Sequence, residues 1–246
     1  MSTPTHTAQP PTARATARLA GWLYLVTFAS SIPAVGLLAP ILNDPAYILG
    51  SGSDTSVMLG ALLDMINAAA CIGTAVVLYR VARRQSAAAA LGFVTARVME
   101  AAIIMIGVVA LVAAVTMRQD LADAAGTDPA ALQAVGTSLV EMRNATFLLG
   151  PSLIPGINAL LLGTVMYRSG LVPRIIPTMG LIGGPLIIAS VVTTMLGINH
   201  EGSVFAVAAT VPIFLWELTL GAWMAFKGFR DTPITAAIDA KAAQRV

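Results

Sequence analysis

The chain has 246 residues, of which 57% are apolar and only 11% are charged, and its mean hydropathy is +0.82. Because a soluble domain carries roughly 25% charged residues, this composition excludes a water-soluble globule, a disordered chain, a collagen-like fibre and a disulfide-stapled module. The net charge of +2 comes without a basic run long enough to bind nucleic acid. We therefore expect an integral membrane protein whose partner is the lipid bilayer, and no nucleic-acid partner.

Six apolar stretches are long enough to cross a bilayer. A spanning helix needs roughly 20 apolar residues, since the hydrocarbon core is about 30 Å thick and each helical residue rises about 1.5 Å. The stretches are too long and too continuous for the strands of a membrane barrel, which alternate over about ten residues. The sequence therefore predicts an all-α, polytopic fold with six transmembrane helices, near residues 19–42, 57–79, 88–116, 140–167, 175–198 and 203–227.

The positions of arginine and lysine predict the orientation of these helices, because both are retained on the cytoplasmic side. The loops on the opposite side carry mostly aspartate and glutamate, and Arg118 is their only basic residue. We therefore predict a multi-pass protein of the cell (plasma) membrane with both termini cytoplasmic. The basic residues behind this prediction are Arg14, Arg18, Arg80, Arg83, Arg84, Arg168, Arg174, Lys227, Arg230, Lys241 and Arg245.

Composition divides the chain into one membrane domain and two terminal segments. Residues 1–17, rich in proline and threonine, predict a flexible cytoplasmic arm. Residues 18–230 form the six-helix domain, and residues 231–246 form a cytoplasmic tail that is either a short helix or frayed. The apolar run of the first span is too long for an ordinary signal peptide, so we expect it to remain. In the long outer loop, 118–139, an Asp-Pro pair before several alanines predicts a short interfacial helix.

Two motifs predict how the helices bend and pack. Pro151 and Pro155 lie one turn apart, which predicts a break in the fourth span, either a kink without a ligand or the kind of broken helix that transporters place around substrates. Gly180 and Gly184 form a small-xxx-small pair, which lets another helix approach closely. That second helix belongs either to this chain or to a second copy, and the sequence does not predict an oligomeric state.

A few polar residues within the spans are the candidate functional residues. A charge at mid-membrane costs about 2.5 to 3.5 kcal/mol, so such residues usually face the protein interior. Arg97 and Glu100 are three residues apart and share one helical face. At about 1.5 Å per residue, these two, Asn158 and Glu217 all lie roughly 15 to 20 Å from the cytoplasmic ends, which predicts one polar centre.

A secondary polar stripe follows the second span. Asp64, Asn67, Cys71 and Thr74 are spaced three or four residues apart, which places them on one face that should point inward. The buried set then contains three acids and one base. Either one or two carboxyl groups are neutral, or a cation or protonatable ligand supplies the missing charge. The alternative is a structural bridge from Arg97 that merely joins helices.

The sequence contains no motif for metal binding, a cofactor or nucleophilic catalysis. His6 and His200 are the only histidines and lie outside the spans, so no histidine metal motif exists. Cys71 is the only cysteine and reads as a small buried hydrophobe. We expect no metal and no cofactor, and the sequence assigns no catalytic residue. At the outer surface, Glu141, Arg143 and Asn144 open the fourth span and are expected to be interfacial; the alternative is that they line an outer vestibule.

Several stretches resemble a bacterial family of multi-pass membrane proteins, the Domain of Unknown Function 4386 family, over nearly the whole chain apart from the terminal segments. The matching stretches are Ala-Arg-Leu-Ala-Gly-Trp-Leu-Tyr at 17–24, Arg-Val-Met-Glu at 97–100, Tyr-Arg-Ser-Gly-Leu-Val-Pro-Arg at 167–174, Trp-Glu-Leu at 216–218 and Lys-Gly-Phe at 227–229. The Ser-Gly-Leu-Val-Pro-Arg loop is the most specific. The resemblance implies a compact helical membrane domain and brings no reaction, and its motifs include Arg97, Glu100 and Glu217.

Three functional hypotheses remain open. The first is a proton- or cation-linked carrier or channel for a small solute, which the excess of buried carboxylates and the broken fourth span favour. The second is a membrane interaction or scaffold protein whose polar centre only fixes helix packing. The third is a carboxylate-based intramembrane enzyme acting on lipid, with Glu100 or Glu217 as general acid or base.

Overall fold

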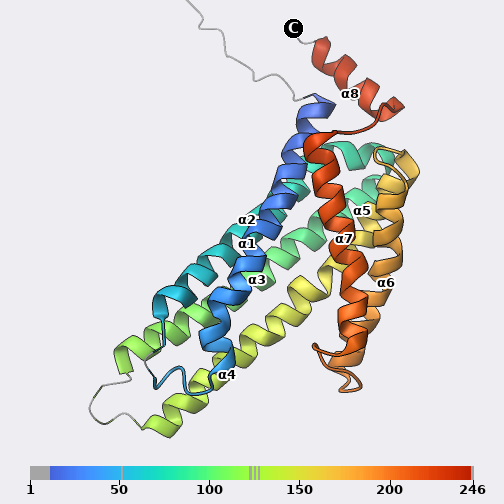
Figure 1. The fold of residues 1–246 in the computed structure, drawn as a ribbon. Coiled ribbons are helices and arrows are strands. Elements are labelled where there is room, and N and C mark those ends of the chain that lie inside the picture. Colours follow the sequence, from blue (N-terminus) through green and yellow to red (C-terminus); the bar gives the residue numbers. More distant parts are fainter. Residues whose placement is uncertain (1–11, 51, 122–123, 125, 127, 245–246) are drawn as a thin grey trace, which may run out of the picture.

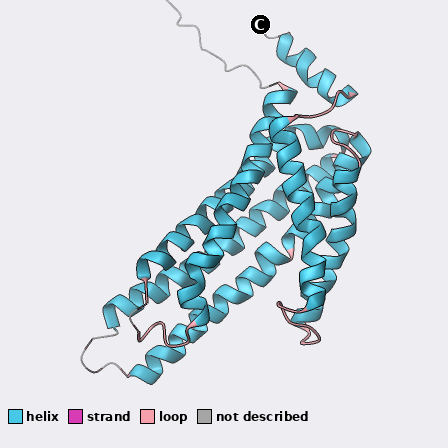
Figure 2. Cartoon of the chain, viewed as in Figure 1, coloured by secondary structure: helices cyan, strands magenta, loops and turns pink. Residues whose placement is uncertain are grey.

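The computed structural model describes residues 12–50, 52–121, 124, 126 and 128–244, and every regular element among them is a helix, which confirms the all-α prediction (Figure 2). Serine, threonine and aspartate side chains cap several of the helix starts, where the first backbone N–H groups have no acceptor within the helix. The elements are α1 (Ala13–Asn43), α2 (Asp54–Gln85), α3 (Ala87–Leu121), α4 (Pro129–Phe147), η1 (Leu148–Ser152), α5 (Ile154–Ser169), α6 (Ile175–Met195), α7 (Val204–Phe226) and α8 (Pro233–Ala243).

Six helical segments are long and apolar enough to cross a membrane, which confirms the predicted number of spans. The fourth segment is α4, η1 and α5 taken together. The first four spans extend past their predicted limits, whereas α6 and α7 stay within theirs. The first span begins earliest relative to the expected domains, since α1 begins at Ala13, inside the expected arm, and the Thr12 hydroxyl caps it. Residues 1–11 of that arm lie outside the described residues. In the expected tail, α8 forms the short helix, and Arg245 lies outside the described residues.

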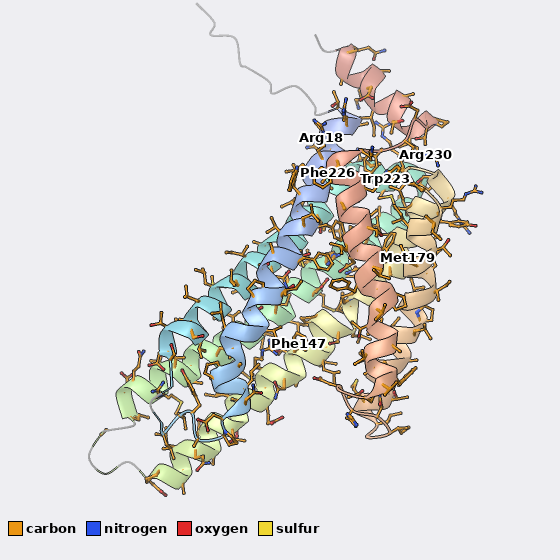
Figure 3. All side chains as sticks on the ribbon, viewed as in Figure 1. Arg18, Phe147, Met179, Trp223, Phe226 and Arg230 are labelled. Atoms are coloured by element: carbon orange, nitrogen blue, oxygen red, sulfur yellow. The ribbon has the colours of Figure 1, made fainter. Side chains whose placement is uncertain are left out.

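Both described ends of the chain lie at the same end of the helical bundle (Figure 1). The turn between α2 and α3 and the loop between α5 and α6 lie there too. A hydrogen bond joins the two ends, because the Ala13 N–H donates to Asp239 Oδ1 over 2.8 Å. In the side-chain view, Arg18, Trp223, Phe226 and Arg230 gather near this end (Figure 3). Which end faces the cytoplasm stays a prediction from the positions of the basic residues.

At the other end, Arg118 is held by polar groups of the chain. Its guanidinium donates to the Gly52 carbonyl over 2.7 Å and also pairs with Asp54, and it stacks on the Tyr47 ring with 4.8 Å between Cζ and the centroid. The Tyr47 hydroxyl donates to Asp54 Oδ1 over 2.7 Å. The only basic residue predicted for the outer loops is therefore neutralised locally by a carboxylate.

The fourth span changes from α-helical to π-helical geometry where the two prolines predicted a break, and the segment stays helical from Pro129 to Ser169. Pro151 lies inside the single π-helical turn η1, and Pro155 lies in the first turn of α5. The prediction of a separate interfacial helix in 118–139 is wrong. Asp128 caps α4 at Pro129, and the helix then continues to Phe147. No helix-ending residue separates the alanine-rich start from the apolar segment, so the two propagate as one helix.

The glycine pair of α6 packs within the chain. A methyl group built on Gly180 would lie 2.7 Å from the Trp216 ring of α7, and one on Gly184 would lie 2.9 Å from the Gly156 carbonyl of α5. Neither distance leaves room for a side chain, so α6 is clamped between α5 and α7. The sequence did not decide whether the helix that packs against this glycine pair belongs to this chain or to a second copy. In the structure it belongs to this chain.

Candidate functional site

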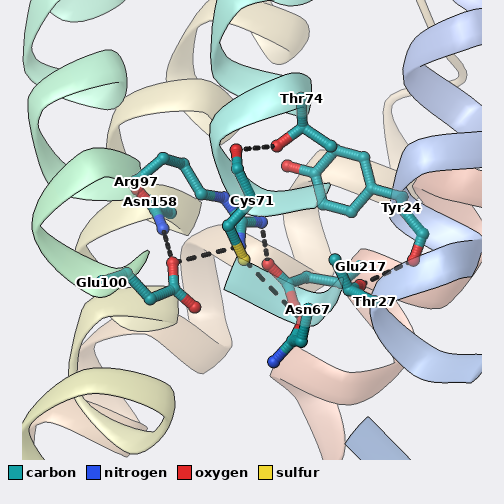
Figure 4. A network of polar contacts seen from close by, with 9 residues as sticks. All are labelled: Tyr24, Thr27, Asn67, Cys71, Thr74, Arg97, Glu100, Asn158 and Glu217. Atoms are coloured by element: carbon teal, nitrogen blue, oxygen red, sulfur yellow. Dashed lines mark hydrogen bonds and ion pairs between the residues drawn. The ribbon is translucent and has the colours of Figure 1, made fainter. Parts of the chain in front are cut away.

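The guanidinium of Arg97 lies at the centre of a buried polar network (Figure 4). Its Nη1 donates to Glu100 Oε2, one turn further along α3, over 3.1 Å. Its Nη2 donates to Glu217 Oε1 of α7 over 2.5 Å. Arg97 is only 2% exposed, so both charge-assisted contacts form away from lipid and bulk water. One guanidinium therefore pairs with two carboxylates from different helices, one oxygen of each, and balances only one of their two negative charges.

Two more helices contribute to this network. Asn158 of α5 donates through Nδ2 to Glu100 Oε2 over 3.0 Å. On α2, Cys71 Sγ lies 3.5 Å from Arg97 Nη1 and 3.9 Å from Asn67 Oδ1. The structure therefore brings together all four residues of the predicted centre and connects them, through Cys71, to the predicted stripe of α2.

Aromatic rings cover the guanidinium where no polar atom does. The Tyr24 ring centroid of α1 lies 5.0 Å from Arg97 Cζ, and that of Phe93 lies 5.9 Å away. Both distances suit a cation–π interaction, which stabilises a desolvated guanidinium. Tyr24 was not among the candidate residues predicted from the sequence. Its place in the 17–24 stretch, which resembles the DUF4386 family, was the one signal that pointed to it.

A second ion pair lies nearer the other end of the bundle. Arg143 Nη2 of α4 is 3.9 Å from Asp64 Oδ2 of α2, which is an ion-pair distance but too long for a hydrogen bond. The Arg143 Cζ also lies 4.7 Å from the Phe147 ring centroid. Arg143 is 8% exposed, so the expectation that it is interfacial is wrong, although Glu141 is exposed as expected. The reason is that α4 begins at Pro129, well before the predicted start of the span.

A cavity of about 280 Å³ extends from the Arg97 network to the Arg143–Asp64 ion pair. At roughly 30 Å³ per molecule, this is room for about nine waters. The walls between the charged groups are largely aromatic and aliphatic, and α1, α2, α3, α4, η1, α5 and α7 all contribute. The charged and amide side chains that line it are Asp64, Asn67, Arg97, Glu100, Arg143 and Glu217, and the phenylalanines are Phe28, Phe147 and Phe214.

A second cavity, also of about 280 Å³, adjoins the first at the π-helical turn of the fourth span. It lies between η1, α6 and α7 and extends to Glu201 in the loop between those two helices. Pro151, Pro155, Phe147 and Thr210 line both cavities. The π-helical turn is therefore the partition between a charged chamber and a chamber that reaches the end of the bundle opposite the described termini.

A family model described as a domain of unknown function (DUF4386) matches residues 19–228. The chain belongs to this family. The matched region contains the six spans, apart from the first six residues of α1, together with the Arg97 network and the Arg143–Asp64 pair, whereas α8 lies beyond it. No curated protein and no solved structure matches the chain.

The charge count of the DUF4386 domain's cavity differs from the sequence-based count. Arg143 adds a second base, so three carboxylates, Asp64, Glu100 and Glu217, face two guanidinium groups. With all five groups ionised, the cavity carries one net negative charge. Among the residues that the structure describes, no three histidine, cysteine or acidic side chains cluster as metal ligands would. With that charge, the cavity would attract one proton or one small cation.

Proposed function

We propose that this protein is a proton- or cation-linked carrier or channel for a small solute, and that the cavity between the two ion pairs is the solute site. The observation that carries this proposal is a chamber among membrane-spanning helices that reaches both Arg97 and Glu217. Charged groups inside a membrane domain are costly, and they usually mark the path of an ion or solute. A lining of apolar walls with a few convergent polar groups is also typical of small-molecule sites.

The π-helical turn of the fourth span supports a transport route through the domain. Such turns within helices are frequent at functional sites, and prolines in membrane helices free backbone groups that water or solute can satisfy. Here residues of the turn and of the helices on either side of it line both cavities. With the basic ends on the cytoplasmic side, the second cavity opens toward the outer side, and solute would enter the charged chamber past Phe147 and Thr210.

The net negative charge of the chamber supports coupling to a cation. One proton or monovalent cation neutralises the five ionised groups, so its binding and that of a solute are energetically linked. Glu217 is the best residue to carry this coupling, because it contacts Arg97 through one oxygen and its side chain keeps 13% exposure toward the cavity.

Flux through reconstituted protein tests the proposal. Purified protein in proteoliposomes should take up at least one solute from a panel of small amines, acids and zwitterions, faster with an imposed pH or sodium gradient. Glu217→Gln should abolish the gradient dependence while the protein remains folded. Glu141→Gln is the matched control, because that carboxylate is exposed and lies outside the charged cavity. Unchanged flux in Glu217→Gln, or no flux of any solute under any gradient, would contradict the proposal.

A scaffold role is the second candidate, and one observation favours it. The Arg97 network joins α2, α3, α5 and α7, so it contributes to helix packing whatever else it does. For a scaffold, the same Glu217→Gln variant should change thermal stability alone. The lipid-modifying alternative is tested by incubating the protein with lipid extracts, where a product formed by the wild type and missing with Glu217→Gln would support it.

A further inference from the structure

We infer that the solute of the charged cavity is a small, extended zwitterion, whose carboxylate binds Arg143 and whose ammonium group binds Glu217 and Glu100. This inference rests on the proposed function and names the solute class for the same site. It follows from which polar atoms around the cavity are already bonded and which are still free to bind a ligand.

The guanidinium of Arg143 is the cationic group of the cavity that donates none of the described hydrogen bonds. Its closest anionic partner, Asp64, remains 3.9 Å away, and no side chain that the structure describes accepts a hydrogen bond from it. A guanidinium has five N–H donors in a planar fork that matches a carboxylate in two-point contact. By contrast, both terminal nitrogens of Arg97 already donate to carboxylates. An anionic group in this cavity therefore binds at Arg143.

Carboxylate oxygens without a described donor lie at both ends of the cavity, but the excess of carboxylates lies at the Arg97 end. Within the described chain, Asp64 accepts no hydrogen bond and faces Arg143 one to one. Glu217 and Glu100, by contrast, share the single guanidinium of Arg97. No described residue donates to the second oxygen of either glutamate, Glu217 Oε2 or Glu100 Oε1. Both residues line the cavity. An ammonium group has three N–H donors and no acceptor, so two carboxylate oxygens that lack a donor suit it. A cationic group of the solute therefore binds at this end.

The distance between the two ends sets the length of the solute. Asp64, which pairs with Arg143, and Cys71, which contacts Arg97, are seven residues apart on α2. At about 1.5 Å per residue, the two ends are roughly 10 Å apart. A single α-amino acid cannot span this distance, whereas an amino acid with its ammonium group at the far end of a carbon chain can. The volume of about 280 Å³ is sufficient for such a molecule.

Charge balance distinguishes a zwitterion from singly charged solutes. With all five groups ionised, a zwitterion leaves the cavity's net charge of −1 unchanged, so one coupled proton or cation is still needed, as the proposed function requires. A simple amine neutralises the cavity alone but leaves Arg143 without an anionic partner at hydrogen-bond distance. A simple carboxylate raises the negative charge to two. Of the three classes, the zwitterion alone satisfies both ends of the cavity and keeps a reason for coupling.

Calorimetric titration of the purified full chain in detergent tests this inference directly. The probes are glycine, γ-aminobutyrate and ε-aminocaproate, with hexylamine and hexanoate as singly charged compounds of the same chain length, each corrected for protein-free micelles. We expect ε-aminocaproate to bind at least about tenfold more tightly than glycine, hexylamine or hexanoate, because only it satisfies both ends. Arg143→Gln should remove that advantage without weakening hexylamine binding, because it makes the cavity more negative, and Arg143→Lys should restore part of it. The exposed Arg174→Gln is the matched control.

The outcomes separate this inference from the proposed function. Hexylamine binding as tightly as ε-aminocaproate, with no effect of Arg143→Gln on their ratio, would overturn the zwitterion assignment, and flux of an amine would still support a carrier. If ε-aminocaproate binds as expected but crosses no proteoliposome membrane, the carrier proposal fails and the site assignment stands. Hexylamine also reports on folding, because a folded Arg143→Gln retains its binding; if that variant does not fold, the ratio measured in Arg143→Lys decides. Absence of binding by every probe to the wild type overturns the assignment.

Discussion

Replacing Arg97 by glutamine should destabilise the protein far more than replacing either glutamate that it binds. Arg97 is one cation facing two carboxylates, at 3.1 Å from Glu100 and 2.5 Å from Glu217. Without Arg97, two buried carboxylates remain without a cation, and stranding a buried charge costs about 3 to 5 kcal/mol. Without Glu217, a balanced one-to-one pair remains, and the loss is that of a charge-assisted hydrogen bond, about 1.5 to 3 kcal/mol.

The same geometry predicts that the two effects are not additive. Arg97→Gln combined with Glu217→Gln strands one carboxylate in place of two, so the double variant should be more stable than Arg97→Gln alone. The assay is unfolding of the purified protein in mixed micelles by titration with a denaturing detergent, with the free energy of unfolding as the readout. Arg174→Gln, at an exposed position, should change this free energy by no more than about 0.5 kcal/mol. Additive effects, or a smaller loss for Arg97→Gln than for Glu217→Gln, would refute the reasoning.

Three further predictions concern other parts of the fold. Gly184→Leu should reduce stability by about 1 to 3 kcal/mol, because its Cβ would lie 2.9 Å from the Gly156 carbonyl; thermal unfolding measures this. Asp239→Ala should speed amide hydrogen exchange at the start of α1, because the Ala13 N–H loses its acceptor. Burial and a hydrogen bond to a carboxylate raise the pKa of Tyr47 from 10.0 to about 12, which stabilises the folded state while the hydroxyl is protonated. Wild-type stability should therefore fall relative to Tyr47→Phe between about pH 10 and pH 12.

Matched controls make these predictions specific. Gly36→Ala should be neutral or slightly stabilising, since a methyl group there meets nothing within 4 Å. Lys241→Ala lies on the same helix as Asp239 but is exposed, and it should leave hydrogen exchange at the start of α1 unchanged. Equal losses for Gly184→Leu and Gly36→Ala, equal exchange in the two α8 variants, or parallel stability curves for wild type and Tyr47→Phe would each contradict the corresponding contact.

The spans and the polar centre followed from simple physical limits on the sequence. Bilayer thickness and helical rise fixed the number of spans. The spacing of Arg97 and Glu100 fixed their common face, since three residues make nearly one turn. Counting the helical rise from the cytoplasmic helix ends then placed Asn158 and Glu217 at the same depth in the membrane as this pair. In the structure, both contact the Arg97–Glu100 pair. These inferences succeed because a long membrane helix has one regular geometry, so position along the chain converts directly into depth.

Arg143 and Tyr24 could not be selected in the same way. The segment before Arg143 is alanine-rich and only weakly apolar, so hydropathy placed the start of the fourth span at 140 instead of Pro129. An arginine near an apparent helix end reads as interfacial, whereas it lies well inside α4. Tyr24 acts through the face of its ring, and its contact with Arg97 depends on how α1 packs against α2 and α7. Side-chain contacts between distant helices are set by tertiary packing, which local spacing does not encode.

Water access to the cavity from one side of the membrane tests the central claim most directly. Single cysteines replace Thr210, which lines both cavities, and its neighbour Val211, which is 49% exposed and absent from both linings. Each replacement is made in a Cys71→Ser background. A membrane-impermeant thiol reagent is then added to either side of oriented proteoliposomes. We predict rapid labelling at position 210 from the side of the α6–α7 loop alone and little labelling at position 211. No labelling at 210 from either side, or equal labelling at both positions, would contradict the account.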